Sequence, residues 1–111
     1  MLQTDENYKN RLQVVLQKAF KVTPIYMEIG DWDEEQGYHM GVFLCIGQHH
    51  HGLTLNDAKT MFDIVNCLED VVIYVADNDK VWLFLGESKH KIKKKAEQAA
   101  CKSAYEILIG A

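Results

Sequence analysis

The closing stretch KHKIKKKAEQAACKSAYEIL, residues 89–108, decides the fold. Within it, Ala96, Ala100 and Ala104 recur at every fourth position, and Leu108 follows at the same spacing. This spacing places all four side chains on one face of a helix, for which we expect the range 93–109. Because three of them are alanines, the helix can lie close to the layer that it covers.

Five lysines open this helix or come directly before it: Lys89, Lys91, Lys93, Lys94 and Lys95. The N-terminus of a helix is already positive, so each cation in its first turn is unfavourable by roughly 0.3–1 kcal/mol. The chain has a formal net charge of −4, yet residues 81–111 contain six lysines and three acids. Amide groups, helix dipole and ammonium groups at one helix start together form a strong phosphate site. The lysines therefore predict contact with an anion.

The composition limits the class of protein. With 111 residues, 48% of them hydrophobic and 25% charged, the chain is expected to form one folded domain. It has no apolar run of the roughly 18 residues that span a membrane, and no basic-then-apolar signal sequence. Three widely spaced cysteines, Cys45, Cys67 and Cys101, indicate free thiols in a reducing compartment, cytoplasmic or otherwise intracellular.

Hydrophobic periodicity predicts the other elements of the chain. In chain order they are a helix over 7–20, strands over 25–29 and 42–46 joined by a polar loop over 30–39, a helix over 54–69, and strands over 71–76 and 81–86 joined by a tight turn. We expect Asn56 or Asp57 to cap the middle helix. The order α-β-β-(α-β)-β-α predicts an α+β domain whose helices pack on one face of an antiparallel sheet. In it, 71–76 would be the edge strand beside 81–86.

Two of these helices resemble those of a known family. NYKNRLQVVLQKAF (7–20) is similar to the first helix of double-stranded RNA-binding domains, especially the C-terminal domain of ribonuclease III. KKKAEQAACKSAYEIL (93–108) resembles the signature last helix of that family. Gly86 stands ten residues before Ala96, where the family usually has the glycine that ends its third strand.

The first hairpin carries a further point of resemblance. His39, four residues before Phe43, is placed similarly to the family's first-loop histidine and second-strand aromatic residue. The resemblance covers residues 7–47 and 81–109. It leaves 48–80 as a helix–strand unit inserted in a single domain over 1–111.

The resemblance implies a partner and a set of contacts. Domains of this family bind A-form RNA duplexes by shape, through two successive minor grooves and the major-groove phosphates between them. The implied contacts are Lys9, Asn10 and Gln13 for one minor groove, Gly37 and His39 for the other, and Lys93, Lys94 and Lys95 for the phosphates, with Lys89 and Lys91 as additional backbone contacts. Double-stranded RNA is the expected partner, and no cofactor or membrane is expected.

Departures from the family pattern favour a second interpretation. Val14 stands where a ribonuclease III domain often has glutamate, and Ile92 replaces the usual serine. The polar loop also contains four acids that repel phosphate, namely Asp31, Asp33, Glu34 and Glu35. The alternative is a protein-interaction module of the same fold, which forms a homodimer through the inserted segment and binds RNA weakly or not at all.

The chain contains no predicted catalytic residues. The acidic, magnesium-binding helix typical of ribonuclease III is not in this sequence, so within such an enzyme the chain would be the RNA-binding module. His49, His50 and His51 are adjacent in a loop with no paired cysteine, and such an arrangement rarely builds a closed metal site. We therefore predict neither a metal site nor a catalytic site in these residues.

Overall fold

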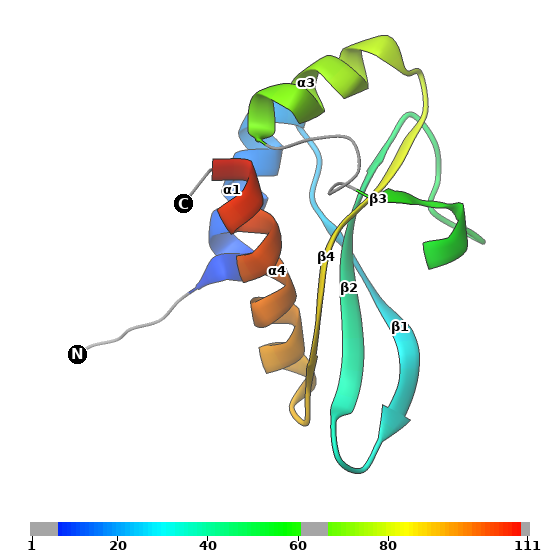
Figure 1. Ribbon diagram of the computed structural model, residues 1–111. Coiled ribbons are helices and arrows are strands. Elements are labelled where there is room, and N and C mark those ends of the chain that lie inside the picture. Colours follow the sequence, from blue (N-terminus) through cyan, green and yellow to red (C-terminus); the bar gives the residue numbers. More distant parts are fainter. Residues whose placement is uncertain (1–6, 61–66, 110–111) are drawn as a thin grey trace.

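The computed structural model describes residues 7–60 and 67–109 (Figure 1). In chain order its elements are α1 (Tyr8–Phe20), β1 (Ile25–Asp33), β2 (Gly37–Ile46), the 3-10 helix η1 (Leu55–Asp57), β3 (Lys59–Thr60), α3 (Leu68–Asp77), β4 (Val81–His90) and α4 (Lys93–Ile109). The predicted first and last helices are confirmed by α1 and α4. Within the described ranges, no helix has the length and apolar character needed to cross a membrane.

The four strands form one sheet in the order β1-β2-β4-β3. The pairs β1–β2 and β2–β4 are antiparallel, and Phe43 of β2 lies between Ile25 of β1 and Phe84 of β4. In contrast, β3 pairs with β4 in parallel through Lys59 and Thr60. The α+β class is confirmed, but the sheet is mixed, so the expectation of a purely antiparallel sheet is wrong.

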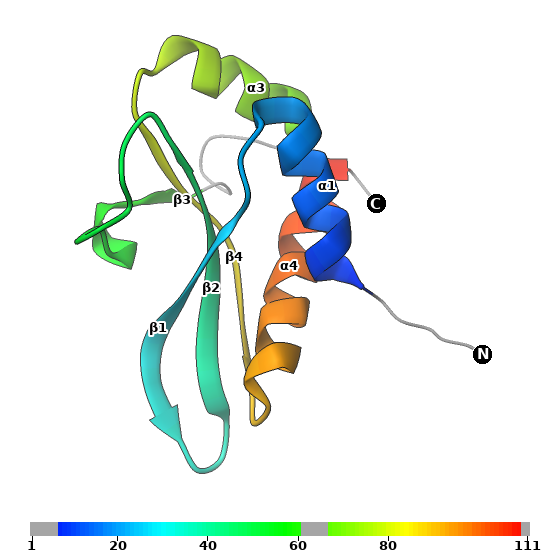
Figure 2. The same cartoon turned by 180° about the vertical axis from the view of Figure 1, so that it is seen from behind.

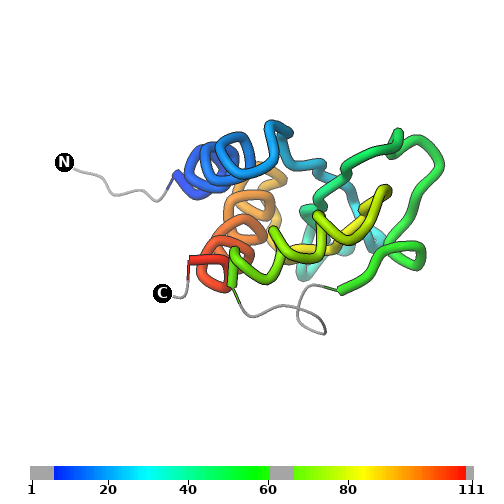
Figure 3. Tube along the Cα trace, turned by 90° about the horizontal axis from the view of Figure 1, so that it is seen from above, coloured from blue at the N-terminus to red at the C-terminus, as the bar shows by residue number. Residues whose placement is uncertain are grey.

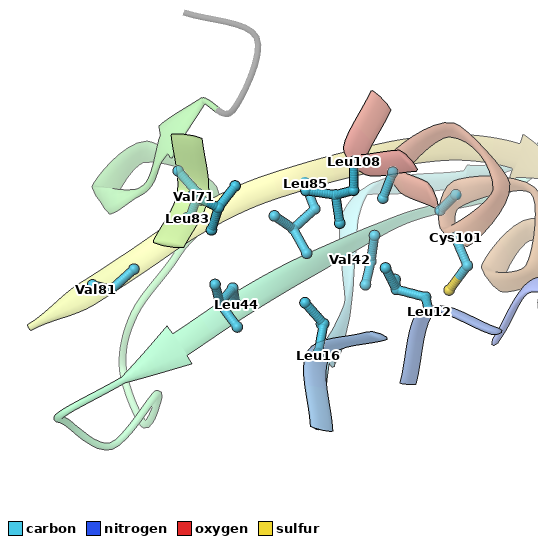
Figure 4. Close-up of a cluster of buried hydrophobic side chains, with 12 residues drawn as sticks. Leu12, Leu16, Val42, Leu44, Val71, Val81, Leu83, Leu85, Cys101 and Leu108 are labelled. Carbon is cyan, nitrogen blue, oxygen red and sulfur yellow. The ribbon is translucent and has the colours of Figure 1, made fainter. Parts of the chain in front are cut away.

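Helices α1 and α4 lie side by side over one face of the sheet (Figures 1 and 2). Alternate residues of β2 and β4 point toward them, as the two-residue period of a strand requires. Figure 4 shows the resulting core, whose fully buried side chains include Leu12, Leu16, Val42, Leu44, Val81, Leu83, Leu85 and Cys101. α4 lies very close to the sheet at Gly86, which has no side chain: a Cβ added there would stand 2.7 Å from the carbonyl oxygen of Ala100.

The opposite face of the sheet is covered by the chain around η1. There the rings of Phe43 and Trp82 stack almost in parallel with their centroids 4.6 Å apart, and Leu55 packs against them. The indole Nε1–H of Trp82 donates to the carbonyl oxygen of Thr54 at 2.8 Å. These contacts hold the segment that leads into β3 against the sheet.

The inserted segment places its strand before its helix, the reverse of the predicted order. η1 and β3 occupy the first part of the predicted helix over 54–69, of which residues 61–66 lie outside the described residues. The expected capping role of Asn56 or Asp57 is wrong for the same reason. Asp57 accepts the N–H of Thr54 at 2.9 Å, but this bond closes the start of the short η1.

Residues 71–76, predicted as an edge strand, belong to helix α3, which begins beside the end of α4 (Figure 3). Because β3 and β4 are parallel neighbours, the chain between them must cross over, and a tight hairpin turn cannot do this. α3 is part of that crossover. Val71 is buried in the core, and Leu68 and Val75 pack against the same cluster at helical spacing. The edge position beside β4 is therefore occupied by β3.

The first hairpin is longer, and its loop shorter, than expected. β1 continues to Asp33, and residues 34–36 form the turn in place of the predicted loop over 30–39. The Asp33 carboxylate shapes this turn by accepting the N–H groups of Glu35 and Gln36 at 2.7 and 2.9 Å. The hairpin tip lies at the same end of the molecule as the start of α4, whereas α3 lies at the opposite end (Figure 1).

Candidate nucleic-acid interface

The lysine cluster lies where β4 turns into α4 and consists of Lys89, Lys91, Lys93, Lys94 and Lys95. All five residues are exposed. Among the residues that the structure describes, only one carboxylate comes within ion-pair distance of the cluster: Oε1 of Glu28 lies 3.6 Å from Nζ of Lys93. The cluster therefore presents positive charge to solvent at one end of the molecule.

The start of α4 adds backbone donors to this cluster. The first N–H groups of a helix have no intrahelical acceptor. The carbonyl oxygen of Ile92 accepts the N–H groups of Lys95 and Ala96, both at 3.0 Å. The imidazole Nδ1 of His90 accepts the N–H of Ile92 at 2.9 Å and so restrains the turn before the helix. The positive end of the helix dipole and the ammonium groups meet here, which is an arrangement suited to phosphate.

Helix α1 brings Asn10 and Gln13 to the surface. Both residues are exposed, and their three-residue spacing makes them neighbours on the helix. Lys9 was predicted as a contact together with them, but its side chain is only 33% exposed and its Nζ lies 2.7 Å from Oε1 of Glu97 in α4. Asn10 and Gln13 are thus open to a ligand, whereas Lys9 is engaged with α4.

Gly37 and His39, the predicted contacts of the hairpin loop, both lie in β2. Gly37 is buried, and a Cβ there would collide with the backbone of His90 and Lys91. The Nε2 of His39 lies 2.5 Å from Oε1 of Glu87, and strand alternation places it on the sheet face opposite α1 and α4. The expectation of a loop histidine is wrong, because strand pairing extends beyond this position.

Four exposed carboxylates surround the hairpin tip, namely those of Asp31, Asp33, Glu34 and Glu35. The backbone N–H groups of Gln36 and Glu35 lower the pKa of the Asp33 carboxyl, and the charge of Lys89 acts in the same direction. Asp33 is therefore ionised at neutral pH. The tip carries negative charge close to the lysine cluster, and this opposes phosphate binding there.

Several partners of the predicted site residues were not found from the sequence: Glu28, Glu87, Glu97 and Gln98. Glu28 and Glu97 form the ion pairs described above, Glu87 lies within hydrogen-bond distance of His39, and Oε1 of Gln98 accepts the backbone N–H of Lys9 at 2.9 Å. Lys9 and Gln98 are 89 positions apart. No local spacing indicates such a contact, because it exists only once α1 and α4 pack together.

The three adjacent histidines follow β2 in an exposed loop. The ring centroids of His50 and His51 lie 6.1 Å apart, with the ring planes at 59° to each other. Within the described part of the chain, no three His, Cys, Asp or Glu side chains gather so that they could hold a metal ion.

Comparison of the chain with protein-family models, curated proteins and solved structures finds no match. The class that the structure shows is an α+β domain with a mixed four-stranded sheet.

Proposed function

We propose that this protein binds double-stranded RNA by recognising the shape of the A-form duplex. The observation that carries the proposal is the exposed lysine cluster at the start of α4, on a domain whose α1 also exposes Asn10 and Gln13. The frame α1-β1-β2-β4-α4 supports the proposal, because it has the element order implied by the resemblance to double-stranded RNA-binding domains. By the same resemblance, the chain would serve as the RNA-binding module of a ribonuclease III.

Each part of this surface has its own chemistry in the proposal. The ammonium groups of Lys93 and Lys94, with the first amides of α4, contact phosphates that border the major groove. Asn10 and Gln13 donate and accept hydrogen bonds at 2′-hydroxyl groups and base edges in a minor groove. The acidic hairpin tip weakens contact with the next minor groove, so affinity depends mainly on α4 and α1.

The test is binding of an RNA duplex of about 20 base pairs, compared with DNA of the same sequence, across a salt series. We expect RNA-selective binding whose log affinity falls linearly with log salt concentration. Lys93→Glu/Lys94→Glu should lower the affinity at least about tenfold and reduce the salt slope by about two, because each lysine displaces about one counterion.

Lys59→Glu/Lys80→Glu is the matched control for this variant. It changes the net charge by the same amount at exposed lysines of β3 and of the turn before β4. Its loss of affinity should be much smaller. Equal losses of affinity in the two variants would mean that net charge alone explains the effect. A folded wild type that binds no RNA duplex would refute the proposal.

A second candidate function is dimerisation through the inserted segment. It is favoured by two apolar residues of α3, since Val72 is 45% and Ile73 is 60% exposed. The carboxylates of the hairpin tip favour it as well, because they weaken RNA binding. In this alternative, a second copy of the chain covers α3.

Sedimentation equilibrium of the wild type and of Ile73→Glu tests the dimer. A dimer formed through α3 should dissociate in Ile73→Glu, because a buried carboxylate without a partner is costly at an interface. Val14→Glu is the control, since Val14 on α1 is 44% exposed and lies outside the inserted segment. A wild type that remains monomeric excludes this candidate.

A further inference from the structure

The N-terminus of α1 is held by α4 instead of by its own cap residue. Asn7 occupies the N-cap position but makes no side-chain hydrogen bond to the helix. The backbone N–H of Lys9, one of the first amides of α1, donates instead to Oε1 of Gln98 at 2.9 Å. Gln98 therefore does for α1, from another helix, what a capping side chain normally does from within.

The side chain of Lys9 makes a second link at the same place. Its Nζ lies 2.7 Å from Oε1 of Glu97, whose side chain is only 13% exposed. The same Nζ lies 4.8 Å from the ring centroid of Tyr26 in β1, within the range of an attractive cation–π contact. The Lys9 ammonium is thus directed into the junction of α1, α4 and β1.

Aromatic contacts support this junction. The ring of Tyr8 packs edge-on against Tyr105 of α4 with centroids 5.8 Å apart, and Nζ of Lys102 lies 5.8 Å from the Tyr8 ring. Asn10 follows Lys9 directly in the chain. The junction therefore sets where the exposed side of α1 stands relative to the first turn of α4.

We propose that Glu97 and Gln98 are positioning residues which, through Lys9, set the spacing between α1 and the lysine cluster. In an A-form duplex, the geometry of the RNA double helix sets the distance from the minor-groove edge to the bordering phosphates. A protein surface that contacts both gains affinity when α1 is held in place before binding. This inference rests on the proposed RNA binding, and it moves Lys9 from the ligand contacts to the support of the site.

Whether one charge-removing substitution raises or lowers the RNA affinity separates a positioning role from a purely electrostatic one. Glu97→Gln removes a carboxylate near the lysine cluster, so electrostatics alone would strengthen the binding of a polyanion. Loss of the ion pair with Lys9, which the glutamine amide can replace only with a weaker neutral hydrogen bond, would weaken binding instead. We expect the RNA affinity of Glu97→Gln to fall about fivefold, because a less restrained α1 must be ordered when the RNA binds.

A second variant tests the cap without changing charge. Gln98→Leu removes the acceptor for the Lys9 N–H and keeps a side chain of similar size. We expect a similar loss of RNA affinity, an unchanged salt slope, and faster hydrogen exchange of amides in the first turns of α1. The exchange measurement needs no RNA, so it reports on the cap independently of the proposed function.

Glu106→Gln is the matched control, because Glu106 is an exposed carboxylate farther along α4. It should not weaken RNA binding and should leave exchange in α1 unchanged. All variants are compared well below their thermal unfolding transitions, so that folded protein is compared with folded protein.

Weaker RNA binding by both Glu97→Gln and Gln98→Leu, with faster exchange in α1, supports the positioning role. Tighter RNA binding by Glu97→Gln, or unchanged exchange in Gln98→Leu, overturns it. If the folded wild type binds no RNA, the proposed function fails, whereas faster α1 exchange in Gln98→Leu would still establish the cap.

Discussion

At the residue scale, Gly37 shows how one position joins two parts of the site. Its φ of 81° lies in the left-handed region, which glycine adopts without strain. An added Cβ would meet the carbonyl oxygen of His90 and the Cα of Lys91. Gly37 thus lets the first hairpin pack directly against the turn that carries the lysine cluster.

Gly37→Ala should lower the free energy of unfolding by about 3 kcal/mol, through backbone strain and collision together. Gly52→Ala is the matched control, because Gly52 has a φ of 80° but an added Cβ would meet no atom within 4 Å apart from those of its chain neighbours. It should cost only about 1 kcal/mol, the strain of the left-handed conformation. Urea unfolding measures both costs. Equal costs would show that the backbone of His90 and Lys91 leaves room for a side chain at position 37.

The buried thiol of Cys101 makes the stability of the protein depend on pH. Burial raises the pKa of its thiol to about 11 from an ordinary value of 9.0, and burial also raises the pKa of the nearby Tyr26 hydroxyl. The folded protein holds these protons more tightly than the unfolded chain does. Its stability is therefore fully present below pH 9 and falls as the pH rises toward 11.

Urea unfolding at about pH 8 and about pH 10.5 measures this effect, with an expected loss of about 2 kcal/mol in the free energy of unfolding. The free energy of unfolding of Cys101→Ala should fall less between the two pH values, because this variant has no thiol that titrates. The comparison uses the difference between the two pH values, so the cavity left by the substitution cancels. An equal loss in the variant would contradict the assignment to Cys101.

At the element scale, the short parallel strand β3 decides the path of the inserted segment. Its two residues, Lys59–Thr60, lie beside β4, and the parallel direction makes α3 part of a crossover. The segment before β3 is held by Trp82, which donates to Thr54 and stacks on Phe43. The contacts of Trp82 therefore hold the segment that leads into β3 on the sheet face opposite α1 and α4.

Trp82→Phe should lower the free energy of unfolding by about 1–2 kcal/mol, because it keeps an aromatic ring on Phe43 but leaves the Thr54 carbonyl without its donor. Trp32→Phe is the control: Trp32 is 55% exposed in β1, and its substitution should change stability by less than about 0.5 kcal/mol. Urea unfolding followed by circular dichroism compares them. Similar costs would argue against the Thr54 bond as the support of β3.

At the scale of the whole molecule, charges of both signs meet at one end. The lysine cluster and the acidic hairpin tip lie together at one end, and α3 lies at the other (Figures 1 and 2). The formal net charge of −4 opposes a polyanion in general. Because salt screens exposed charges beyond about 8–10 Å, the carboxylates nearest the lysine cluster have the greatest effect on RNA binding.

Asp31→Asn/Glu34→Gln/Glu35→Gln should raise the affinity for duplex RNA about threefold to tenfold, because it removes three negative charges near the lysine cluster. Asp33 is kept, since its carboxylate holds the turn. The measurement is the same salt series with an RNA duplex. The gain should shrink as the salt concentration rises.

The control Glu69→Gln/Asp77→Asn/Asp79→Asn removes the same charge from exposed residues in and just after α3. It should change RNA affinity less than about twofold, because these carboxylates lie at the opposite end of the molecule. Equal gains from the two triple variants would mean that net charge alone governs binding.

Local pattern was enough to predict the two helices that carry the candidate site. The alanines of α4 and the leucines of α1 recur at helical spacing, and the lysines are adjacent in the chain. The pattern failed at 71–76, where β-branched residues favour a strand. There, the parallel pairing of β3 with β4 and the burial of Val71 favour a helix.

The sequence by itself determined the α+β class, the helices α1 and α4, and the exposed cluster of cations, because these depend on neighbouring residues along the chain. Only the tertiary structure decided the direction of β3, the helical state of 71–76, the place of His39 in a strand and the engagement of Lys9 with Glu97 and Gln98. The physical reason is that strand direction and long-range pairing are set by packing between segments far apart in sequence. Such packing overrides local propensity whenever it buries more apolar surface or satisfies more polar groups.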